Sequence, residues 1–305
     1  MARVIVTGGA GFIGSHVADA FLARGDDVLV VDDLSTGLMT NVPKGAAFEQ
    51  LDIADHAALG RALESGADLV CHLAAQASVT VSVEDPLLDC TSNVIGTLNV
   101  CEAARRRGAP VVFASTGGAL YGDDAPRPTP ETFAAQPLSP YGASKLAGEA
   151  YVATWGRLYA QPNVVLRLGN VYGPRQNPHG EAGVVAIFSG RLLNGEQPYL
   201  RGGGKPSRDY VYVTDVADAF IAAAERARAG TYNVGTGRET STARLLEILQ
   251  EAAGTAIEPL QVELQAGELQ ASTLDASAIE RELGWRPKVE LEAGLRRTFA
   301  WYRPE

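Results

Sequence analysis

The chain has 305 residues, of which 46% are hydrophobic and 20% charged, a balance typical of a globular enzyme of one large domain or two that share a core. Its net charge of −10 argues against nucleic acid and anionic membranes as partners. Because MARVIVTGGA has neither a basic leader nor a long apolar segment, we expect no secretion or membrane insertion, and a cytoplasmic protein.

Short β-branched runs alternate with longer amphipathic runs through the first half of the chain. Strands are expected at residues 3–6, 27–31, 47–51, 68–73, 110–114 and 163–168, mostly apolar on both faces. Helices are expected at 15–25, 56–65, 93–107 and 141–160. This alternation predicts an α/β fold with a Rossmann-like, doubly wound parallel sheet.

The amino-acid composition changes after Asn170, where Gly and Pro become frequent and short strands are expected to follow. Two further helices are expected near residues 245–253 and 276–283. We therefore predict a first domain over 1–170 and a smaller α/β substrate-binding domain over 171–305, at the carboxyl ends of the strands. The boundary is soft, because residues 209–225 could return to the first domain.

A glycine-rich turn stands between the first predicted strand and the first predicted helix. The residues VIVTGGAGFIGSH fit GxGxxG with Gly9, Gly11 and Gly14, or TGxxGxxG with Gly8, Gly11 and Gly14. Both patterns serve one purpose, because glycine permits a tight turn and lets the backbone approach a pyrophosphate at a helix amino terminus. We expect a dinucleotide-binding site here.

Acidic residues at the end of the second predicted strand indicate which dinucleotide binds. Asp32 and its neighbour Asp33 lie about 20 residues beyond the glycines, where a carboxylate accepts hydrogen bonds from the adenine ribose. No Arg or Lys follows before Lys44, so a 2′-phosphate would meet two negative charges and no cation. NAD is therefore expected rather than NADP. Asp52, after the third strand, could reach the adenine amine or could equally cap the next helix.

The stretch SPYGASK, residues 139–145, places a phenol and an amine four residues apart. On a helix, Tyr141 and Lys145 share one face, with their β-carbons about 5–6 Å apart. Taken alone, the pair fits a solvated helix face with a half-buried ring better than a catalytic site. Its meaning depends on the rest of the chain.

The cysteines and histidines give no support for a disulfide framework or a metal site. The sequence shows no CxxC, HxH or HExxH spacing, so we expect reduced, buried thiols, structural imidazoles and no bound metal. The residues concerned are Cys71, Cys90, Cys101, His16, His56, His72 and His179.

Eight motifs in a fixed order carry a resemblance that covers nearly the whole chain. They are TGGAGFIGSH, VVDDLS, LDIAD, HLAAQAS, the helix of Asn93, SPYGASK, GNVYGPRQ and RDYVYVTDVA. In this order the chain resembles the extended short-chain dehydrogenase/reductase family, above all its nucleotide-sugar epimerases. The resemblance implies a homodimer, in which helices 93–107 and 141–159 of each subunit form a four-helix contact that includes Trp155.

The resemblance also implies that Tyr141 and Lys145 are the acid/base pair of the family. Tyr141 would accept a proton from a sugar hydroxyl, while Lys145 lowers its pKa and holds the nicotinamide ribose. Bringing a tyrosine pKa from about 10 to about 7 takes about 4 kcal/mol. Opposite charges ~4 Å apart at an effective dielectric of about 20 supply about that much, and the positive nicotinamide ring adds to it.

A third catalytic residue, a Ser or Thr, usually precedes the Tyr of a Tyr-Gly pair by four positions in this family. In FASTGGALYG that place, counted back from Tyr121, falls on Gly117, which departs from the pattern. We expect Thr116 to supply the hydroxyl, with Ser115 as the second candidate and water as the remaining alternative.

The same loop separates the reactions of the family. Related dehydratases and decarboxylases carry acidic residues where this chain has Gly118 and Ala119, neither of which can move a proton. The resemblance therefore implies epimerisation at C4: Tyr141 takes the O4 proton as hydride passes to NAD⁺, the 4-keto sugar turns over in an open pocket, and hydride returns to its other face. Two rivals are a non-catalytic NAD-binding regulator and a net reductase or dehydratase.

Cofactor contacts follow from the same motifs. Those implied are Gly8, Gly11, Phe12, Ile13, Gly14, Asp32, Asp33, Ser35, Asp52, Ile53, Leu73, Ala74, Ala75, Gln76, Asn93, Tyr141 and Lys145.

Substrate contacts are implied at Thr116 and in the second half of the chain. Asn170 and Arg208 match positions that meet the sugar diphosphate, although Arg208 could instead form a salt bridge to Asp209. A uridine end could be lined by Val184 and Val185, and Arg201 could stack on a base or ribose, or lie on the surface.

A second departure concerns the late segment AGELQASTLD, where relatives commonly carry arginines that hold the pyrophosphate. This chain has no arginine there, so the grip on the diphosphate could shift to others. The positions in question are Leu264, Gln265, Gln270 and Ala271, and the alternatives are Arg175, Arg201 and Arg208.

The resemblance favours UDP-glucose and UDP-galactose as the sugar pair. UDP-glucuronate and UDP-galacturonate come second, because Arg191 or Arg201 would read a C6 carboxylate if either faces the pocket.

Overall fold

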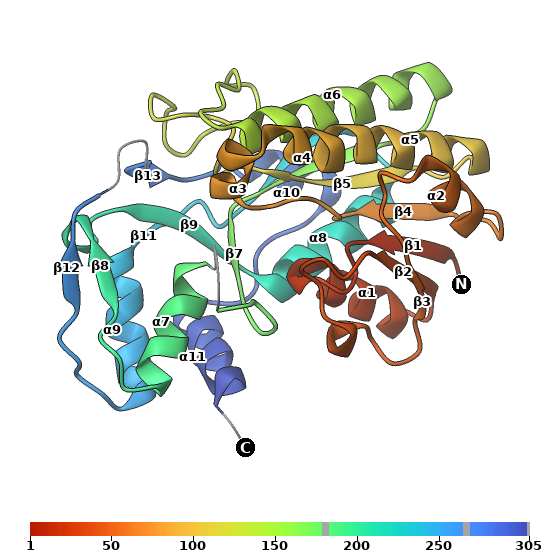
Figure 1. Cartoon of the computed structure of the whole chain (residues 1–305). Helices are drawn as coiled ribbons and strands as arrows, with labels where there is room; N and C mark the ends of the chain where they lie inside the picture. The colour runs from red at the N-terminus through yellow and green to blue at the C-terminus, as the bar shows by residue number, and fades with distance from the viewer. Residues whose placement is uncertain (179–182, 265–268, 304–305) are drawn as a thin grey trace.

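The computed structural model describes residues 1–178, 183–264 and 269–303 as one large parallel sheet with helices on both faces and a smaller layer at one end (Figure 1). Two residues singled out from the sequence, His179 and Gln265, lie outside the described residues. Within the described part, no helix is long and apolar enough to cross a membrane.

The large sheet has seven strands, all parallel, in the order β10-β6-β5-β4-β1-β2-β3. This order reverses between β1 and β4, so a crevice forms at their carboxyl ends, where doubly wound sheets bind ligands. The strands are β1 (Arg3–Thr7), β2 (Asp27–Asp32), β3 (Ala47–Gln50), β4 (Leu69–His72), β5 (Val111–Thr116), β6 (Val164–Leu168) and β10 (Gly230–Val234).

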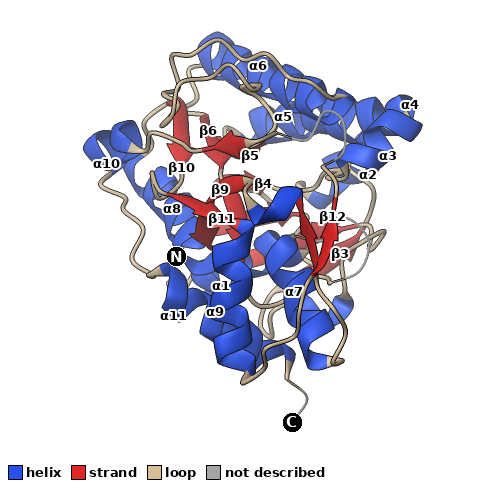
Figure 2. Ribbon diagram, turned by 90° about the vertical axis from the view of Figure 1, so that its left-hand side faces the viewer, coloured by secondary structure: helices blue, strands red, loops and turns tan. Residues whose placement is uncertain are grey.

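Helices cover both faces of this sheet, which confirms the predicted fold class (Figure 2). On one face, α1 (Phe12–Ala23), α8 (Val213–Arg226) and α10 (Ser277–Leu283) pack on the strands. On the other face lie α2 (His56–Ala62), α5 (Gly96–Arg107) and α6 (Pro140–Tyr159). Strands covered on both faces must be apolar throughout, and the inner strands are buried along nearly their whole length.

Between β4 and α5 the chain makes more than the single helix predicted for 93–107. Two short helices, α3 (Val79–Glu84) and α4 (Pro86–Cys90), come first, and a π-helical turn (Thr91–Ile95) then leads into α5. Such turns widen a helix locally and are frequent at functional sites. This one carries the buried Asn93.

The smaller layer lies beyond the carboxyl ends of the strands, as predicted for such sheets (Figure 1). Its sheets contain β7 (Asn170–Tyr172), β9 (Ser207–Tyr212), β11 (Glu239–Ser241) and β13 (Ala271–Ser272), and separately β8 (Tyr199–Arg201) with β12 (Leu260–Val262). Its helices are α7 (Val184–Leu193), α9 (Thr242–Ala253) and α11 (Leu291–Tyr302), around a core of their own.

The start of α6 is set by local sequence. Ser139 is its N-cap and accepts a hydrogen bond from the Gly142 amide at 3.2 Å, while Pro140 stands at the first helical position, where its missing N–H costs nothing. Tyr141 is thereby held in the first turn, at the end of the helix that faces the sheet's carboxyl edge.

The cysteines follow the expectation of buried thiols at two positions of three. Cys71 and Cys101 are buried, and burial raises the pKa of Cys101 to about 12. For Cys90 the expectation was wrong, because its side chain is exposed at the end of α4. An apolar neighbourhood in the sequence did not reveal which way a single residue of a short helix would point.

His72 joins the two strands at the crevice. Its Nδ1 lies 2.8 Å from the Thr7 hydroxyl at the end of β1, and its Nε2 lies 3.0 Å from the Thr97 hydroxyl on α5. Complete burial, with a smaller contribution from Lys145, lowers the pKa of His72 to about 3. The ring is therefore neutral and structural over the physiological range.

This shift predicts a loss of stability in acid. Because His72 takes up its proton near pH 6.5 when unfolded but only near pH 3 when folded, its contribution is complete above pH 6.5 and is lost as the pH falls toward 3. Between pH 7 and pH 5 it accounts for about 2 kcal/mol. In His72→Gln the difference in unfolding free energy between these pH values, measured with denaturant, should shrink by about that amount. The His56→Gln variant should keep the wild-type difference, because His56 is exposed. If His72→Gln also keeps the wild-type difference in unfolding free energy, the acid instability does not come from His72.

Candidate functional site

The glycine turn leaves no room for side chains. Gly8 has φ +72°, and a β-carbon on it would lie 2.5 Å from the Ala74 nitrogen. A β-carbon on Gly14 would lie 2.1 Å from the Gly8 carbonyl oxygen, and the Gly11 amide donates to that same oxygen at 3.1 Å. The close contacts therefore join Gly8, Gly11 and Gly14, while Gly9 packs on Val30 behind the turn.

The amino end of α1 fits an anionic group. Gly11 is its N-cap and provides no side chain, so no side chain accepts from the first amides of the helix. Those amides and the helix dipole are the groups that bind a pyrophosphate in dinucleotide folds. Phe12 and Ile13, both predicted to contact the cofactor, form the first turn and are half-buried.

Asp32 ties this turn to the end of β2. Its carboxylate accepts hydrogen bonds from the Ala10 amide at 3.0 Å and the Leu34 amide at 2.9 Å. Burial raises its pKa and these two bonds oppose the rise. Asp33 is exposed and accepts from both the amide and the hydroxyl of Ser35. The two carboxylates therefore stand at the carboxyl end of β2, next to the glycine turn.

Two further predicted cofactor contacts, Asp52 and Ile53, follow β3. Asp52 is exposed and accepts from the Ala54 amide at 2.8 Å, while the cap of α2 is Asp55. Ile53 is buried against Gly96, whose β-carbon would lie 2.6 Å from it, so its side chain belongs to the core. Only the backbone of Ile53 is left to face a cofactor.

Asn93 organises the loop after β4. Its Oδ1 accepts from the Gln76 amide and its Nδ2 donates to the Gln76 carbonyl oxygen, both at 2.9 Å. The same Nδ2 lies 3.1 Å from the Ser144 hydroxyl on α6. The loop of Leu73, Ala74, Ala75 and Gln76 is thus fastened to the helix that carries Tyr141 and Lys145.

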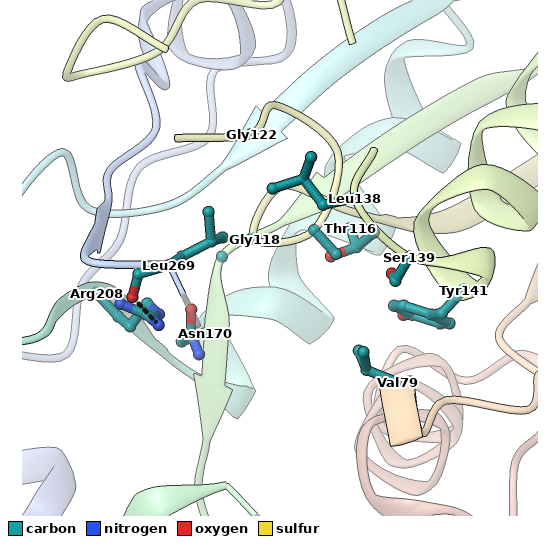
Figure 3. A pocket seen from close by; sticks show the side chains of 12 residues that line it. Val79, Thr116, Gly118, Gly122, Leu138, Ser139, Tyr141, Asn170, Arg208 and Leu269 are labelled. Atoms are coloured by element: carbon teal, nitrogen blue, oxygen red, sulfur yellow. Dashed lines mark hydrogen bonds between the residues drawn. The ribbon is translucent and has the colours of Figure 1, made fainter. Parts of the chain in front are cut away.

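A cavity of about 380 Å³ opens between the two layers (Figure 3). Thr116, Tyr141, Asn170 and Arg208 bring hydrogen-bonding groups to its wall from four different elements, β5, α6, β7 and β9. The remaining lining residues are Val79, Gly118, Ala119, Gly122, Leu138, Ser139, Gly169 and Leu269. The sequence thus predicted these four polar residues and missed most of the apolar wall, because no motif marks it.

The two hydroxyls proposed for the third catalytic position point to different places. Thr116 lines the cavity, and its side chain is hydrogen-bonded to Tyr141. Ser115 is buried and donates to Glu149 Oε1 at 2.5 Å. Since neighbouring residues of a strand point to opposite faces, only one of them can reach the cavity, and it is Thr116.

Lys145 is buried behind Tyr141. Its Nζ lies 4.4 Å from the centre of the Phe113 ring, and its side chain is on the same face of α6 as Tyr141. Burial lowers the pKa of Lys145 to about 8, although Glu149 and Asp89 both oppose the fall. The ammonium group thus stays charged at neutral pH.

The expected direction of the Tyr141 pKa was wrong for the protein by itself. Burial raises the pKa of Tyr141 to about 12, Asp89 adds to the rise, and the Thr116 hydrogen bond only partly opposes it. The desolvation of a phenolate in this wall is therefore the largest effect on the Tyr141 hydroxyl.

The glycines after Thr116 fit the packing of the loop. A β-carbon on Gly117 would lie 2.5 Å from the Leu274 side chain, so the usual Ser or Thr has no room there. Gly118 and Ala119, which stand where related dehydratases and decarboxylases carry acidic residues, line the cavity. A β-carbon on Gly118 would make only an ordinary contact with Asn170.

Arg208 faces the cavity from β9. It donates to the carbonyl oxygen of Ser207 at 2.8 Å and to that of Leu269, also at 2.8 Å, and Figure 3 shows the bond to Leu269. The next residue, Asp209, points the other way and accepts from Thr236 and Gly237. The contacts of Arg208 orient its guanidinium toward the cavity, and those of Asp209 give it a structural role.

Other predicted substrate residues lie away from the cavity wall. Val185 is buried in the core of the small layer and Val184 packs partly on it. Arg191 lies over the Tyr199 ring, 3.9 Å from its centre, and donates to the Gln197 carbonyl oxygen. The exposed Arg201 lies at the end of β8, and the alternative diphosphate ligand Arg175 pairs with Asp19 at 2.7 Å. Within the described residues, no cluster of His, Cys, Asp or Glu could hold a metal ion.

The fold, the glycine turn and the Tyr141–Lys145 helix together define a dinucleotide-binding enzyme of the short-chain dehydrogenase/reductase class. Residues 4–235 match the NAD dependent epimerase/dehydratase family, and the chain belongs to that family. It is 44% identical to the UDP-glucose 4-epimerase of Mycolicibacterium smegmatis, over 99% of this chain and 98% of that protein.

Two solved structures are close in both fold and sequence. The UDP-glucose 4-epimerase of Thermotoga maritima with UDP-glucose has a TM-score of 0.95 and 44% identity, over 98% of both chains. That of Thermus thermophilus in complex with NAD has a TM-score of 0.92 and 48% identity, again over 98% of both. The resemblance carried by the motifs is confirmed, and so is NAD as the cofactor.

The tight glycine turn yields a direct test. Gly14→Ala forces a β-carbon into the Gly8 carbonyl, so the turn must open and NAD affinity should fall by at least about tenfold, or about 1.4 kcal/mol. Gly60→Ala, in α2 with no atom near its new β-carbon, is the matched control and should leave binding unchanged. Calorimetric titration with NAD, after circular dichroism confirms folding, measures both. Wild-type affinity in Gly14→Ala would contradict the assigned turn.

Proposed function

We propose that this protein interconverts UDP-glucose and UDP-galactose by epimerisation at C4 of the sugar. The chain is an isomerase of the NAD-dependent epimerase family and its substrate is a UDP-sugar. The observation that carries the proposal is the Thr116–Tyr141 pair at the wall of a cavity that Asn170 and Arg208 complete.

The roles proposed for the side chains follow from their positions. Thr116 holds the reacting O4 oxygen, and Tyr141 accepts its proton and later returns it. When bound, NAD⁺ supplies the hydride acceptor for C4 and, once reduced, the donor that restores it. Arg208 and Asn170 hold the diphosphate, so that the oxidised sugar can turn while the nucleotide stays fixed.

Ionising Tyr141 is the main energetic obstacle for the protein to overcome. With a pKa near 12, the phenolate at pH 7 costs about 7 kcal/mol. The buried ammonium of Lys145 and the positive charge of the oxidised nicotinamide both favour the phenolate in the complex. The proton is therefore taken up only when cofactor and substrate are both in place.

The cavity also favours the reaction class. An epimerase needs space for a sugar to turn, and small residues (Gly118, Ala119 and Gly122) form part of the wall. None of these carries an acid or base for dehydration or decarboxylation. For UDP-glucuronate the structure offers no support, because Arg191 faces Tyr199 and, among the described residues, neither it nor Arg201 lines the cavity.

A homodimer through α5 and α6 is part of the proposal. Ile95 is 44% exposed just before α5, and Leu158 is 65% exposed on α6. Trp155, the aromatic residue expected in this contact, is partly buried within the subunit, and its indole N–H donates to Glu102 at 2.8 Å. We also propose a cytoplasmic location and a functional division at residue 170, with 1–170 holding NAD and 171–305 the nucleotide-sugar. The α8 segment nevertheless packs against α1.

Tyr141→Phe tests the acid/base assignment. Removing one hydroxyl should lower turnover of UDP-glucose by about 10²–10⁴-fold, because no other group at the wall replaces the proton acceptor. NAD affinity should stay within a few-fold of wild type. Sugar anomeric NMR signals over time report turnover, and calorimetry reports NAD binding. Tyr159→Phe, at an exposed ring of the same helix, is the control, and wild-type turnover in Tyr141→Phe would refute the proposal.

The dimer is tested by light scattering at micromolar concentration. The expected mass is twice the 32.1 kDa of one chain. Leu158→Glu should shift it toward the monomer, because a charge would be buried in the contact, whereas Leu260→Glu on β12 should not. A monomeric wild-type protein would rule out the dimer.

A further inference from the structure

A buried arginine stands behind the cavity, on a central strand of the large sheet. Arg167 lies on β6, and only 7% of its surface is exposed. A buried guanidinium costs free energy unless its charge is paired and its N–H groups find acceptors. Arg167 is not among the described residues that line the cavity, so its use lies in the elements that it joins.

One side of the guanidinium holds helix α6. Arg167 Nε lies 2.9 Å from Glu149 Oε1 and its Nη2 lies 2.6 Å from Oε2, a two-point pairing of fixed geometry. Glu149 follows Lys145 by four residues and Tyr141 by eight, so it continues the helix face that carries both. Ser115 on β5 donates to the same Oε1 at 2.5 Å. The ion pair therefore fastens α6 to β5 and β6.

The other side of the guanidinium holds the loop that follows β5. Arg167 Nη1 donates to the Tyr121 hydroxyl at 2.8 Å, and this hydroxyl donates its own hydrogen to Asn233 Oδ1 at 3.0 Å. Tyr121 is 4% exposed and Asn233 is fully buried. A phenol has one hydrogen to donate, so the hydroxyl is held between a donor and an acceptor. The loop is thus fixed from inside the protein.

Tyr121 belongs to the segment that forms the small-residue wall of the cavity. Gly118 and Gly122, on either side of it, line the cavity (Figure 3), and so does Ala119. The Ala119 carbonyl oxygen would lie 2.6 Å from a β-carbon on Gly142, in the first turn of α6, so wall and helix are in close contact. A movement of the loop relative to α6 would therefore change the width of the cavity.

We propose that Arg167 is a positioning residue for the epimerisation, because its one guanidinium sets the spacing between α6, which carries Tyr141, and the wall of residues 118–122. The proposal rests on the function proposed above for Tyr141. A sugar that is oxidised, turns and is reduced again must meet the same groups twice, and a displacement of about 1 Å can cost about 10²-fold in rate. A planar fork holds two partners at once, which a lysine ammonium does not do with the same geometry.

Two variants remove the link between helix and wall and keep a positive charge beside Glu149. Tyr121→Phe keeps the ring and loses the hydroxyl, so Arg167 still pairs with Glu149. Arg167→Lys keeps the charge, but its single ammonium cannot also hold Tyr121. Tyr232→Phe is the matched control, because Tyr232 is 2% exposed, donates to Glu282 Oε2 at 3.1 Å and lies outside the described cavity wall.

The first measurement needs no substrate. Ala119 lines the cavity, and its methyl NMR signal is identified by its loss in Ala119→Gly. Because Tyr121→Phe keeps the aromatic ring, a change in this signal reports movement of the wall. The signal should shift or broaden in Tyr121→Phe and in Arg167→Lys, and should stay in place in Tyr232→Phe. An Ala119 signal that is unchanged in Tyr121→Phe overturns the proposal.

The second measurement is turnover of UDP-glucose by the NAD-loaded protein. With the wall displaced, kcat/KM should fall by about 10- to 100-fold in Tyr121→Phe and in Arg167→Lys. The double variant should be no slower than Arg167→Lys, because both changes remove one link. The inhibition constant of UDP should stay within a few-fold of wild type, since the residues proposed to hold the diphosphate, Asn170 and Arg208, belong to the other layer.

A merely structural role gives a different result. Losses that multiply in the double variant, or a loss of UDP affinity as large as the loss of kcat/KM, would show a general loosening and overturn the proposal. If the wild type converts no sugar, the proposed function is refuted, while the Ala119 signal still decides whether Arg167 fixes the wall. If Arg167→Lys does not fold by circular dichroism, Tyr121→Phe carries the test, and wild-type kcat/KM in that variant refutes the positioning role.

Discussion

One buried ammonium group sets the terms for the rest of the site. Lys145 is held against the Phe113 ring, out of water, where burial lowers its pKa to about 8 and the charges of Glu149 and Asp89 oppose the fall. A charge in such a place is stable when its neighbours are fixed, since any rearrangement would leave it unpaired. The π-helical turn of Asn93 and the salt bridge of Glu149 provide that rigidity on either side.

Close approach of backbone segments is the second condition. At the crevice, Gly8 touches the loop after β4 and Gly14 touches Gly8, so strand, loop and helix meet without side chains between them. On the opposite wall, the side chain of Leu274, from the second half of the chain, occupies the space that a side chain at Gly117 would need. Small residues thus bring the two layers together around the cavity, and the larger residues that meet them define its walls.

Much of this could be predicted from sequence because the signals are local. Strand positions follow from apolar runs, and the observed ends differ from the expected ones by one or two residues. The glycine turn, Asp32 and the Tyr141–Lys145 spacing lie in contiguous motifs. The prediction failed where orientation mattered, because Cys90 points outward. A short apolar segment does not reveal which of its residues faces the core.

The sequence alone determined the fold class and the cofactor and predicted the acid/base pair, because each depends on residues adjacent in the chain or one helical turn apart. Only the tertiary structure decided which of Thr116 and Ser115 lies at the cavity, since the choice depends on which hydroxyl of β5 reaches Tyr141 and which reaches Glu149. It also decided the electrostatics. The pKa of Tyr141 is raised by burial and by Asp89, which comes from a separate helix and has no motif to mark it.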